Sequence, residues 1–111
     1  MEVIRETKKG VEILRLAGNL IFSELPQAKD VIVPVMDNPA VSKILINLKQ
    51  ISFLDSSGIG FIVGRVKTAK QRQITLALCE CSPTVMDILK TTHLDRILLI
   101  FKTEADALAN L

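Results

Sequence analysis

A short segment in the middle of the chain carries the residues best suited to chemistry. It lies between a nearly continuous apolar run and a helical pattern, and it reads Asp55-Ser56-Ser57-Gly58-Ile59-Gly60. In open α/β sheets, ligands and reactions gather at the carboxyl ends of strands. A helix that begins there offers free N–H groups and a positive partial charge, which favour a phosphate. We therefore expect Ser56 to be exposed, reachable by a kinase and set where a phosphate is tolerated.

Local physics also allows a plainer interpretation of the same residues. Asp and Ser are preferred at helix starts, so Asp55, Ser56 and Ser57 fit the role of ordinary caps. Gly58 would let the backbone turn tightly, and Gly60 would remove a side chain where another protein could approach closely. From these residues alone, capping and modification remain open alternatives.

Catalysis by the serine lacks support in the rest of the chain. A serine nucleophile needs a base, and the only histidine, His93, lies far along the sequence. The glycines form neither a G-x-G-x-x-G motif nor a phosphate loop with lysine. Cys79 and Cys81 have no nearby histidine or further cysteine, so they do not suggest a zinc site, and we expect one in a buried strand and the other just past it. We expect no enzyme activity, no metal and no cofactor.

Composition indicates one small domain over residues 1–111. Hydrophobic residues make up 49% of the chain and charged residues 23%, which is typical of a globular domain with a real core. The net charge of +2 is too small to predict direct nucleic-acid binding. No apolar run approaches the ~18 residues of a membrane-spanning helix, and the first residues lack the apolar stretch of a signal peptide. We therefore expect a cytoplasmic protein without membrane insertion.

Basic residues gather in the helical pattern that follows the serines. They form either a solvated helix face or a partner-binding patch. The residues are Arg65, Lys67, Lys70 and Arg72.

Strand patterns frame the serine segment on both sides. Apolar and alternating residues predict a first strand that begins at Val3, followed by strands over 11–16, 44–48, 74–79 and 97–101. We expect a turn at residues 8–10 after the first strand, and Gly18 with Asn19 should break the second. The run 44–48 is apolar nearly throughout, as in a central strand that is covered on both faces.

Helical patterns alternate with these strands. The first helix is expected to be capped by Ser23 and to be kinked or shortened by Pro34. The second follows the serine segment, with apolar residues spaced at i, i+3, i+4 and i+7. Ser82 is expected to cap a third helix, and Thr103 to begin a terminal helix through a capping box with Asp106.

The element order β-β-α-β-α-β-α-β-α defines an α/β fold class. Alternation of strands and helices implies right-handed crossovers and a mainly parallel sheet of about four to five strands, covered by about four helices. The opening pair of strands is joined by a short turn. We expect this pair to be antiparallel and to lie at an edge of the mixed sheet.

The serine segment and its surroundings resemble the STAS-domain anti-sigma factor antagonists of bacteria. The most specific match is the run Ile51–Gly60, preceded by Ile46–Leu48 and followed by Gly64–Lys67. Further matches at Leu16–Leu20 and Thr92–Ile97 extend the resemblance over nearly the whole chain. The resemblance implies the STAS fold and a non-enzymatic switch protein.

In this family, the first serine after the aspartate is phosphorylated by a partner kinase that is also the anti-sigma factor. The match places that serine at Ser56, with Asp55 capping the helix or orienting the serine. The resemblance implies that the unphosphorylated protein binds the kinase and frees a sigma factor, that phosphorylation ends this binding, and that a serine phosphatase resets the switch. The contact surface would consist of Ser57, Gly58, Ile59 and Gly60.

One departure from the family pattern lies in a loop beside the serine. Many phosphorylatable members carry a carboxylate shortly after the early glycine, whereas this chain has Ile21, and its next acid is Glu24. Ile21 and Phe22 would either be exposed and bind a partner of this protein's own, or lie under the neighbouring helix. The departure favours an alternative, a non-switching STAS module in a signalling scaffold or a transport system, whereas the intact run Asp55-Ser56-Ser57-Gly58 disfavours it. An edge strand or this loop could also support a weak homodimer.

Overall fold

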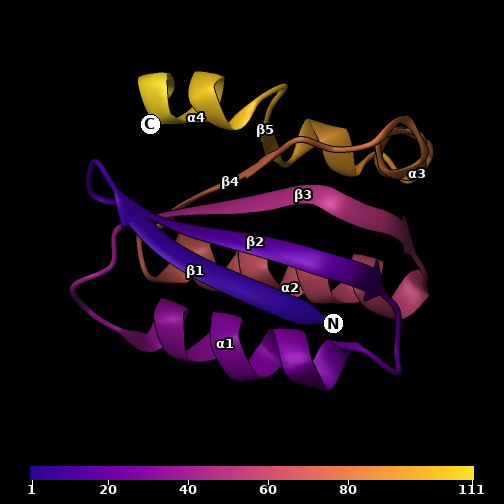
Figure 1. Ribbon diagram of the computed structural model, residues 1–111, viewed down its shortest axis with the longest axis horizontal. Coiled ribbons are helices and arrows are strands. Elements are labelled where there is room, and N and C mark those ends of the chain that lie inside the picture. Colours follow the sequence, from indigo (N-terminus) through magenta and orange to yellow (C-terminus); the bar gives the residue numbers. More distant parts are fainter.

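The computed structural model describes residues 1–111 and places five strands in one sheet (Figure 1). The strands are β1 (Glu2–Lys8), β2 (Val11–Leu20), β3 (Lys43–Leu54), β4 (Thr75–Cys79) and β5 (Leu99–Phe101). The helices are α1 (Leu25–Asp37), α2 (Ser56–Gln71), α3 (Pro83–Thr91) and α4 (Glu104–Asn110), and a short 3-10 helix, η1 (Leu94–Arg96), precedes β5. The order in the sheet is β1-β2-β3-β4-β5, with β1 antiparallel to β2 and the other pairs parallel. The predicted α/β class, element order and antiparallel edge pair are confirmed.

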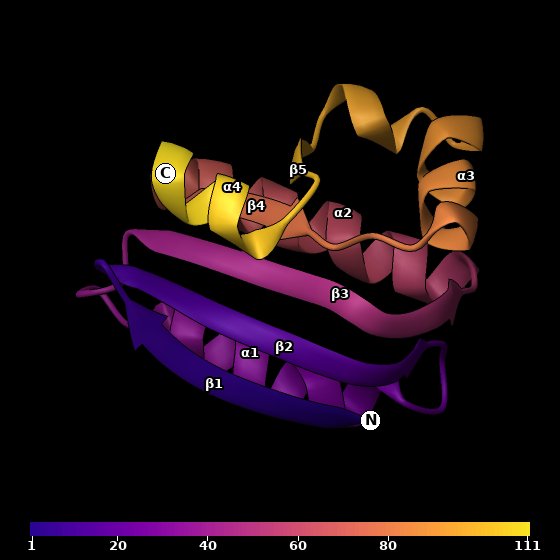
Figure 2. The ribbon, with the colours of Figure 1, turned by 45° about the horizontal axis from the view of Figure 1, so that its top comes forward.

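Helices cover both faces of the sheet, but unequally. Figure 2 shows α1 and α2 on one face and α4 on the other. A large apolar cluster joins the sheet to α1, α2 and α3, and a smaller one joins it to α4 through Ala107. Ile44 and Ile46 of β3 belong to the large cluster and Leu45 to the small one, because successive side chains of a strand point to opposite faces. The prediction of a central strand covered on both faces is confirmed.

The second strand is longer than the sequence predicts. The turn at Lys9 and Gly10 ends β1 as expected, and both residues have the positive φ angles of a tight hairpin turn, 52° and 75°. Gly18 and Asn19, however, do not break β2, which continues to Leu20. The pairing of β2 with β3 shifts register twice, the second time between Gly18 and Leu20. These bulges let the strand accept the φ of 131° at Gly18 and still continue to Leu20.

The predicted cap of α1 was wrong, and the predicted shortening of this helix at Pro34 does not occur. The residue that caps the helix is Glu24 rather than Ser23. The N–H of Glu24 already donates to the carbonyl of Ile21 (2.9 Å), so Ser23 lies inside a tight turn that precedes the helix. Pro34 does not shorten the helix, which continues to Asp37. Pro34 is exposed, so water can bond the backbone carbonyl that its missing N–H leaves free.

The last strand is shorter than predicted, whereas two helix caps are confirmed. The N–H groups of residues 97–98 both donate to the carbonyl of Leu94, which extends the turn of η1 and delays β5 until Leu99. The side chains of Ser82 and Thr103 each accept a bond from the N–H three residues later, as a helix cap requires. None of the helices combines the length and the apolarity that crossing a membrane would require.

Candidate functional site

Ser56 is the first residue of α2 and follows the carboxyl end of the central strand β3 by two positions. Its side chain is exposed, whereas that of Ser57 is half-buried. The expectation that Ser56 is reachable from solvent is confirmed. This placement follows from local sequence: β3 ends at the buried Leu54, and Asp55 then starts the helix in extended conformation. The serine hydroxyl therefore lies where β3 ends and α2 begins.

Asp55 ties two loops together at this point. Its Oδ1 accepts a hydrogen bond from the N–H of Gly58 (2.9 Å), which confirms its predicted role as a cap. Its Oδ2 accepts a second bond from the N–H of Phe22 (3.1 Å), in the loop that connects β2 to α1. The N–H of Gly58, followed by that of Phe22, lowers the pKa of the Asp55 carboxyl. A negative charge therefore already occupies the start of α2, directly beside Ser56.

Replacing Asp55 should show how much its two hydrogen bonds contribute to the stability of the domain. We expect Asp55→Ala to lower the free energy of unfolding by about 1–2 kcal/mol, because it leaves two N–H groups without their acceptor. The matched variant Asp55→Asn keeps a capping oxygen and should lose less, since Asn and Asp cap helices about equally well. Urea titration of the three proteins measures the difference. An equal loss in both variants would mean that the capping bond is not what stabilises this site.

Gly58 packs against β2 and does not form the tight turn that the sequence suggests. Its backbone is helical and the residue is buried. A Cβ atom built at Gly58 would lie 2.0 Å from the carbonyl oxygen of Leu20. Glycine is therefore needed because α2 approaches the end of β2 closely, and Gly58 itself presents little surface to a partner. Gly60, by contrast, is exposed and a Cβ there would meet nothing within 4 Å.

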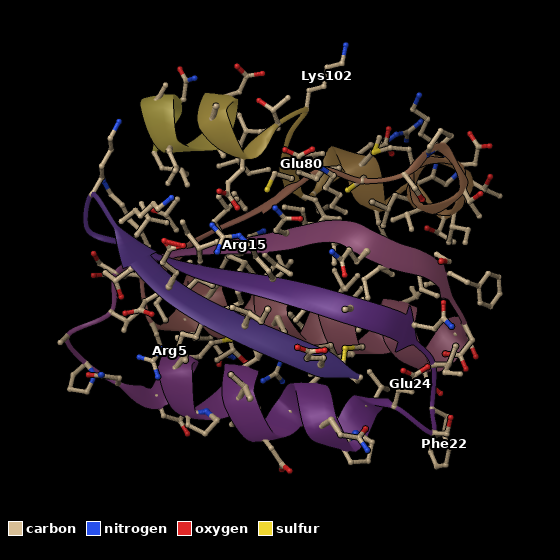
Figure 3. The ribbon with its side chains drawn as sticks, in the orientation of Figure 1. Arg5, Arg15, Phe22, Glu24, Glu80 and Lys102 are labelled. Atoms are coloured by element: carbon tan, nitrogen blue, oxygen red, sulfur yellow. The ribbon has the colours of Figure 1, made fainter.

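The loop with the departure from the family pattern exposes one of its two apolar residues. Phe22 is 76% exposed and projects outward from the loop between β2 and α1 (Figure 3). Ile21 is half-buried, and so is Ile59 on α2. Of the two alternatives for this loop, exposure therefore holds for Phe22. Phe53, which was not predicted as a site residue, is 48% exposed near the end of β3 and adds a second aromatic ring to this end of the molecule.

A groove between α1 and α2 opens beside Ser57. Its volume is about 350 Å³, and we call it the α1–α2 groove. Phe22 and Phe61 supply aromatic surface, and Lys29 and Arg65 supply positive charge. The full lining consists of Phe22, Leu25, Lys29, Ser57, Gly60, Phe61 and Arg65. The groove thus connects a predicted site residue on α2 with the exposed residue of the β2–α1 loop.

The predicted basic cluster divides into residues with different surroundings. The Arg65 guanidinium lies over the ring of Phe61, 5.1 Å from its centre. Arg72 instead bonds the carbonyl of Met36 and the carboxylate of Asp37 at the end of α1. Lys67 and Lys70 are exposed on α2 and do not line the α1–α2 groove. Only Arg65 therefore belongs to the surface beside the serines.

The remaining polar clusters lie away from the serine. Arg15 of β2 pairs with Glu104 of α4 and with Glu6 of β1, and these carboxylates raise its pKa. The buried Asn47 donates to the same Glu104 carboxylate, so the network holds α4 against the sheet near the labelled Arg15 (Figure 3). His93 is exposed and makes no side-chain hydrogen bond to a serine. No group of three or more His, Cys, Asp or Glu side chains is arranged to hold a metal ion.

Comparison with known proteins gives consistent matches along the chain. Residues 2–107 match the family model described as the STAS domain. The chain is 31% identical over 111 residues to the anti-sigma F factor antagonist of Paenibacillus polymyxa. This match covers 100% of this chain and 95% of that protein. The structure of the anti-sigma factor antagonist SpoIIAA in its unphosphorylated form matches with a TM-score of 0.75 and 27% identity, over 96% of this chain and 92% of the other. The structure of the Bacillus cell fate determinant SpoIIAA in the phosphorylated form matches with a TM-score of 0.73 and 26% identity, over 97% of both chains.

Proposed function

Because this chain belongs to the STAS-domain family, we propose that it is a cytoplasmic bacterial anti-sigma factor antagonist that is switched by phosphorylation of Ser56. In this proposal, the unphosphorylated protein binds an anti-sigma factor that is also a serine-protein kinase, and a sigma factor is freed. Phosphorylation of Ser56 ends the binding, and a serine phosphatase restores it. The names of the relatives, anti-sigma F factor antagonist and SpoIIAA in unphosphorylated and phosphorylated forms, support the proposal.

The observation that carries the proposal is the placement of Ser56. It is exposed at the first position of a helix of 16 residues, directly after the aspartate that caps this helix. A kinase needs an exposed hydroxyl, and the start of a helix tolerates the anion that results. The domain can therefore carry the phosphate without unfolding.

The switch itself follows from charge and bulk. A phosphate adds about −1.5 to −2 charge at neutral pH. On Ser56 it would stand next to the Asp55 carboxylate, which already accepts the N–H groups of Gly58 and Phe22. The new anion must therefore stay at the surface and face the partner. At a packed interface, such a group carries a desolvation cost and repels acidic side chains.

Co-purification from the native cell tests this function. The baits are wild type, Ser56→Ala, Ser56→Asp and Ser42→Asp, which adds the same charge at an exposed serine just before β3, at the opposite end of that strand. We expect wild type, Ser56→Ala and Ser42→Asp to retain a histidine-kinase-like ATPase. Ser56→Asp should weaken this binding by at least about tenfold, a loss of about 1.4 kcal/mol. Mass spectrometry identifies the retained proteins and their amounts.

The same experiment separates the switch from the alternative function. If all four baits retain the same proteins, the chain is a constitutive STAS interaction module and Ser56 is only a helix residue. Incubation of the purified ATPase with ATP and wild type then tests whether Ser56, rather than Ser57, accepts the phosphate, with Ser57→Ala as the control. Absence of phosphate on Ser56 would contradict the proposed switch.

A further inference from the structure

We propose that the α1–α2 groove binds an acidic segment of the partner that also carries an apolar anchor, and that a phosphate on Ser56 expels this segment by cancelling the groove's positive charge. The inference deepens the proposed function, since it assigns a chemistry to the partner surface. It rests on the charge, the apolar lining and the position of the groove relative to the serines.

The charge of the groove is positive and uncompensated. Lys29 and Arg65 are the only charged residues in its lining, and neither forms an ion pair or a side-chain hydrogen bond within the protein. The Nε atom of Arg65 is buried and has no acceptor. Because this atom is enclosed, a partner carboxylate would bond the terminal N–H groups of the guanidinium, whose planar fork matches the geometry of a carboxylate. The two positive side chains of the groove therefore have no anionic group to pair with inside the protein, and a partner protein can supply one.

Arg65 is held in place for such a contact. Its guanidinium stacks on the Phe61 ring, 5.1 Å from the ring centre, so its position is restricted by a cation–π contact. Phe61 is itself buried at the base of the groove. Because the side chain is already ordered, less conformational freedom is lost when a carboxylate binds.

The groove also has a place for an apolar side chain. Phe22, which also lines the groove, is 76% exposed, and the absence of a side chain at Gly60 leaves open space in the lining. An exposed aromatic ring beside a positive side chain is typical of interaction hot spots, which are enriched in aromatic residues and Arg. An apolar residue of the partner that packs on Phe22 would remove this ring from water.

The occupant that fits is a protein segment, and nucleic acid does not fit. The two positive charges of the groove flank apolar surface and form no extended basic stripe, which backbone binding to nucleic acid requires. Asp and Glu residues next to a Leu, Ile or Phe would satisfy both parts of the lining. We therefore assign the groove to an acidic segment of the partner protein.

Phosphorylation acts on this groove because of where the serines lie. Ser57 lines the groove and Ser56 precedes it on the same helix. A phosphate of about −1.5 to −2 charge nearly balances the two positive charges of Lys29 and Arg65. An acidic segment would then meet a neutral groove and an adjacent anion. The affinity for this segment should fall although no contact residue has changed.

Photo-cross-linking maps the occupant. Phe22→p-benzoylphenylalanine is introduced into the full chain, the protein is cross-linked to the partner that wild type retains in the co-purification, and the attached peptide is sequenced. We expect a segment with a net negative charge and an apolar residue within a few positions of the cross-link. A cross-link to a basic or uncharged segment would overturn the inference.

Charge reversal then tests the electrostatic part. The variants Arg65→Glu and Lys29→Glu should each lower the affinity for the partner by at least about tenfold, which corresponds to about 1.4 kcal/mol. Lys67→Glu makes the same change on α2 outside the groove and should change the affinity by less than about twofold. Replacing the acids of the cross-linked segment by Lys should restore binding to Arg65→Glu. Thermal unfolding of each variant checks that the fold is kept.

The outcomes distinguish this inference from the proposed function. If Ser56→Asp releases the partner but Arg65→Glu binds as tightly as Lys67→Glu, the groove assignment is wrong and the phosphorylation switch stands. If Arg65→Glu and Lys29→Glu release the partner but Ser56→Asp does not, the acidic segment is supported and its expulsion by phosphate is wrong. If neither class of variant changes binding, both proposals fail.

Discussion

Gly58→Ala should destabilise the folded domain by about 3 kcal/mol, at the upper end of what overpacking usually costs. The added Cβ would lie 2.0 Å from the carbonyl oxygen of Leu20 and 2.9 Å from its carbonyl carbon. These are backbone atoms at the end of β2, so no flexible side chain can move aside. Either α2 must shift away from β2, or β2 must bend away from α2. For a domain of this size, such a loss lowers the melting temperature by roughly 12–20 °C.

Gly60→Ala is the matched control on the same helix, two residues further along. A Cβ there meets nothing within 4 Å, and an exposed helical glycine replaced by alanine usually gains about 0.5–1 kcal/mol. The two substitutions should therefore move the melting temperature in opposite directions. Calorimetry or circular dichroism measures both. A Gly58→Ala protein as stable as wild type would mean that α2 does not pack against Leu20 as closely as described.

Cys79 should react with iodoacetamide at pH 8 about a thousandfold more slowly in the folded protein than in the urea-unfolded chain. Burial in β4, with smaller effects of the nearby Glu104 and Glu80 charges, raises the pKa of its thiol from 9.0 to about 12. Only the thiolate reacts, and each unit of pKa above the solution pH lowers the thiolate fraction about tenfold. Burial also raises the pKa of Cys81, to about 11. Cys81 should therefore react about a hundredfold more slowly in the folded protein than in the unfolded chain.

The pH dependence of the reaction provides the check. Below the pKa, the rate rises about tenfold for each pH unit. In unfolded protein the rate should therefore level off near pH 9, whereas in folded protein the Cys79 rate should keep rising toward pH 12. Quenched aliquots analysed by mass spectrometry give the rate at each cysteine separately. Rapid labelling of folded Cys79 at pH 8 would contradict its structural role in the core.

The periodicity of the sequence predicted the elements well because it reports directly on burial. The apolar run at 44–48 required a strand covered on both faces, and β3 is that strand. Asp55 was predicted as a cap from its residue type, and its bond to the N–H of Gly58 is local in the chain. Placing Ser56 at the start of the following helix needed no distant information. Most of the candidate site could therefore be predicted from neighbouring residues.

The errors occurred where distant segments decide the local structure. Gly58 faces Leu20, and no pattern around the serine shows that these residues meet. The bond from Phe22 to Asp55 also joins residues far apart in the sequence. Pro34 signalled a kinked or shortened helix, but the sequence does not show that it faces solvent, where water can bond the backbone carbonyl that its missing N–H leaves free. Each of these features depends on which elements become neighbours after folding.

The sequential order of the strands has a consequence for how the chain folds. Each strand is bonded only to the strand before it and the strand after it in the sequence, so no pairing must wait for a distant part of the chain. Only the β1–β2 hairpin closes a short loop, however, and each of the three parallel pairings must wait for the crossover helix between its strands. Parallel pairing of this kind forms comparatively slowly. A chain that emerges from the ribosome can build the sheet strand by strand, starting from the β1–β2 hairpin. The apolar β3 is then at an open edge only until β4 has been made, which shortens the period in which it can pair with another chain.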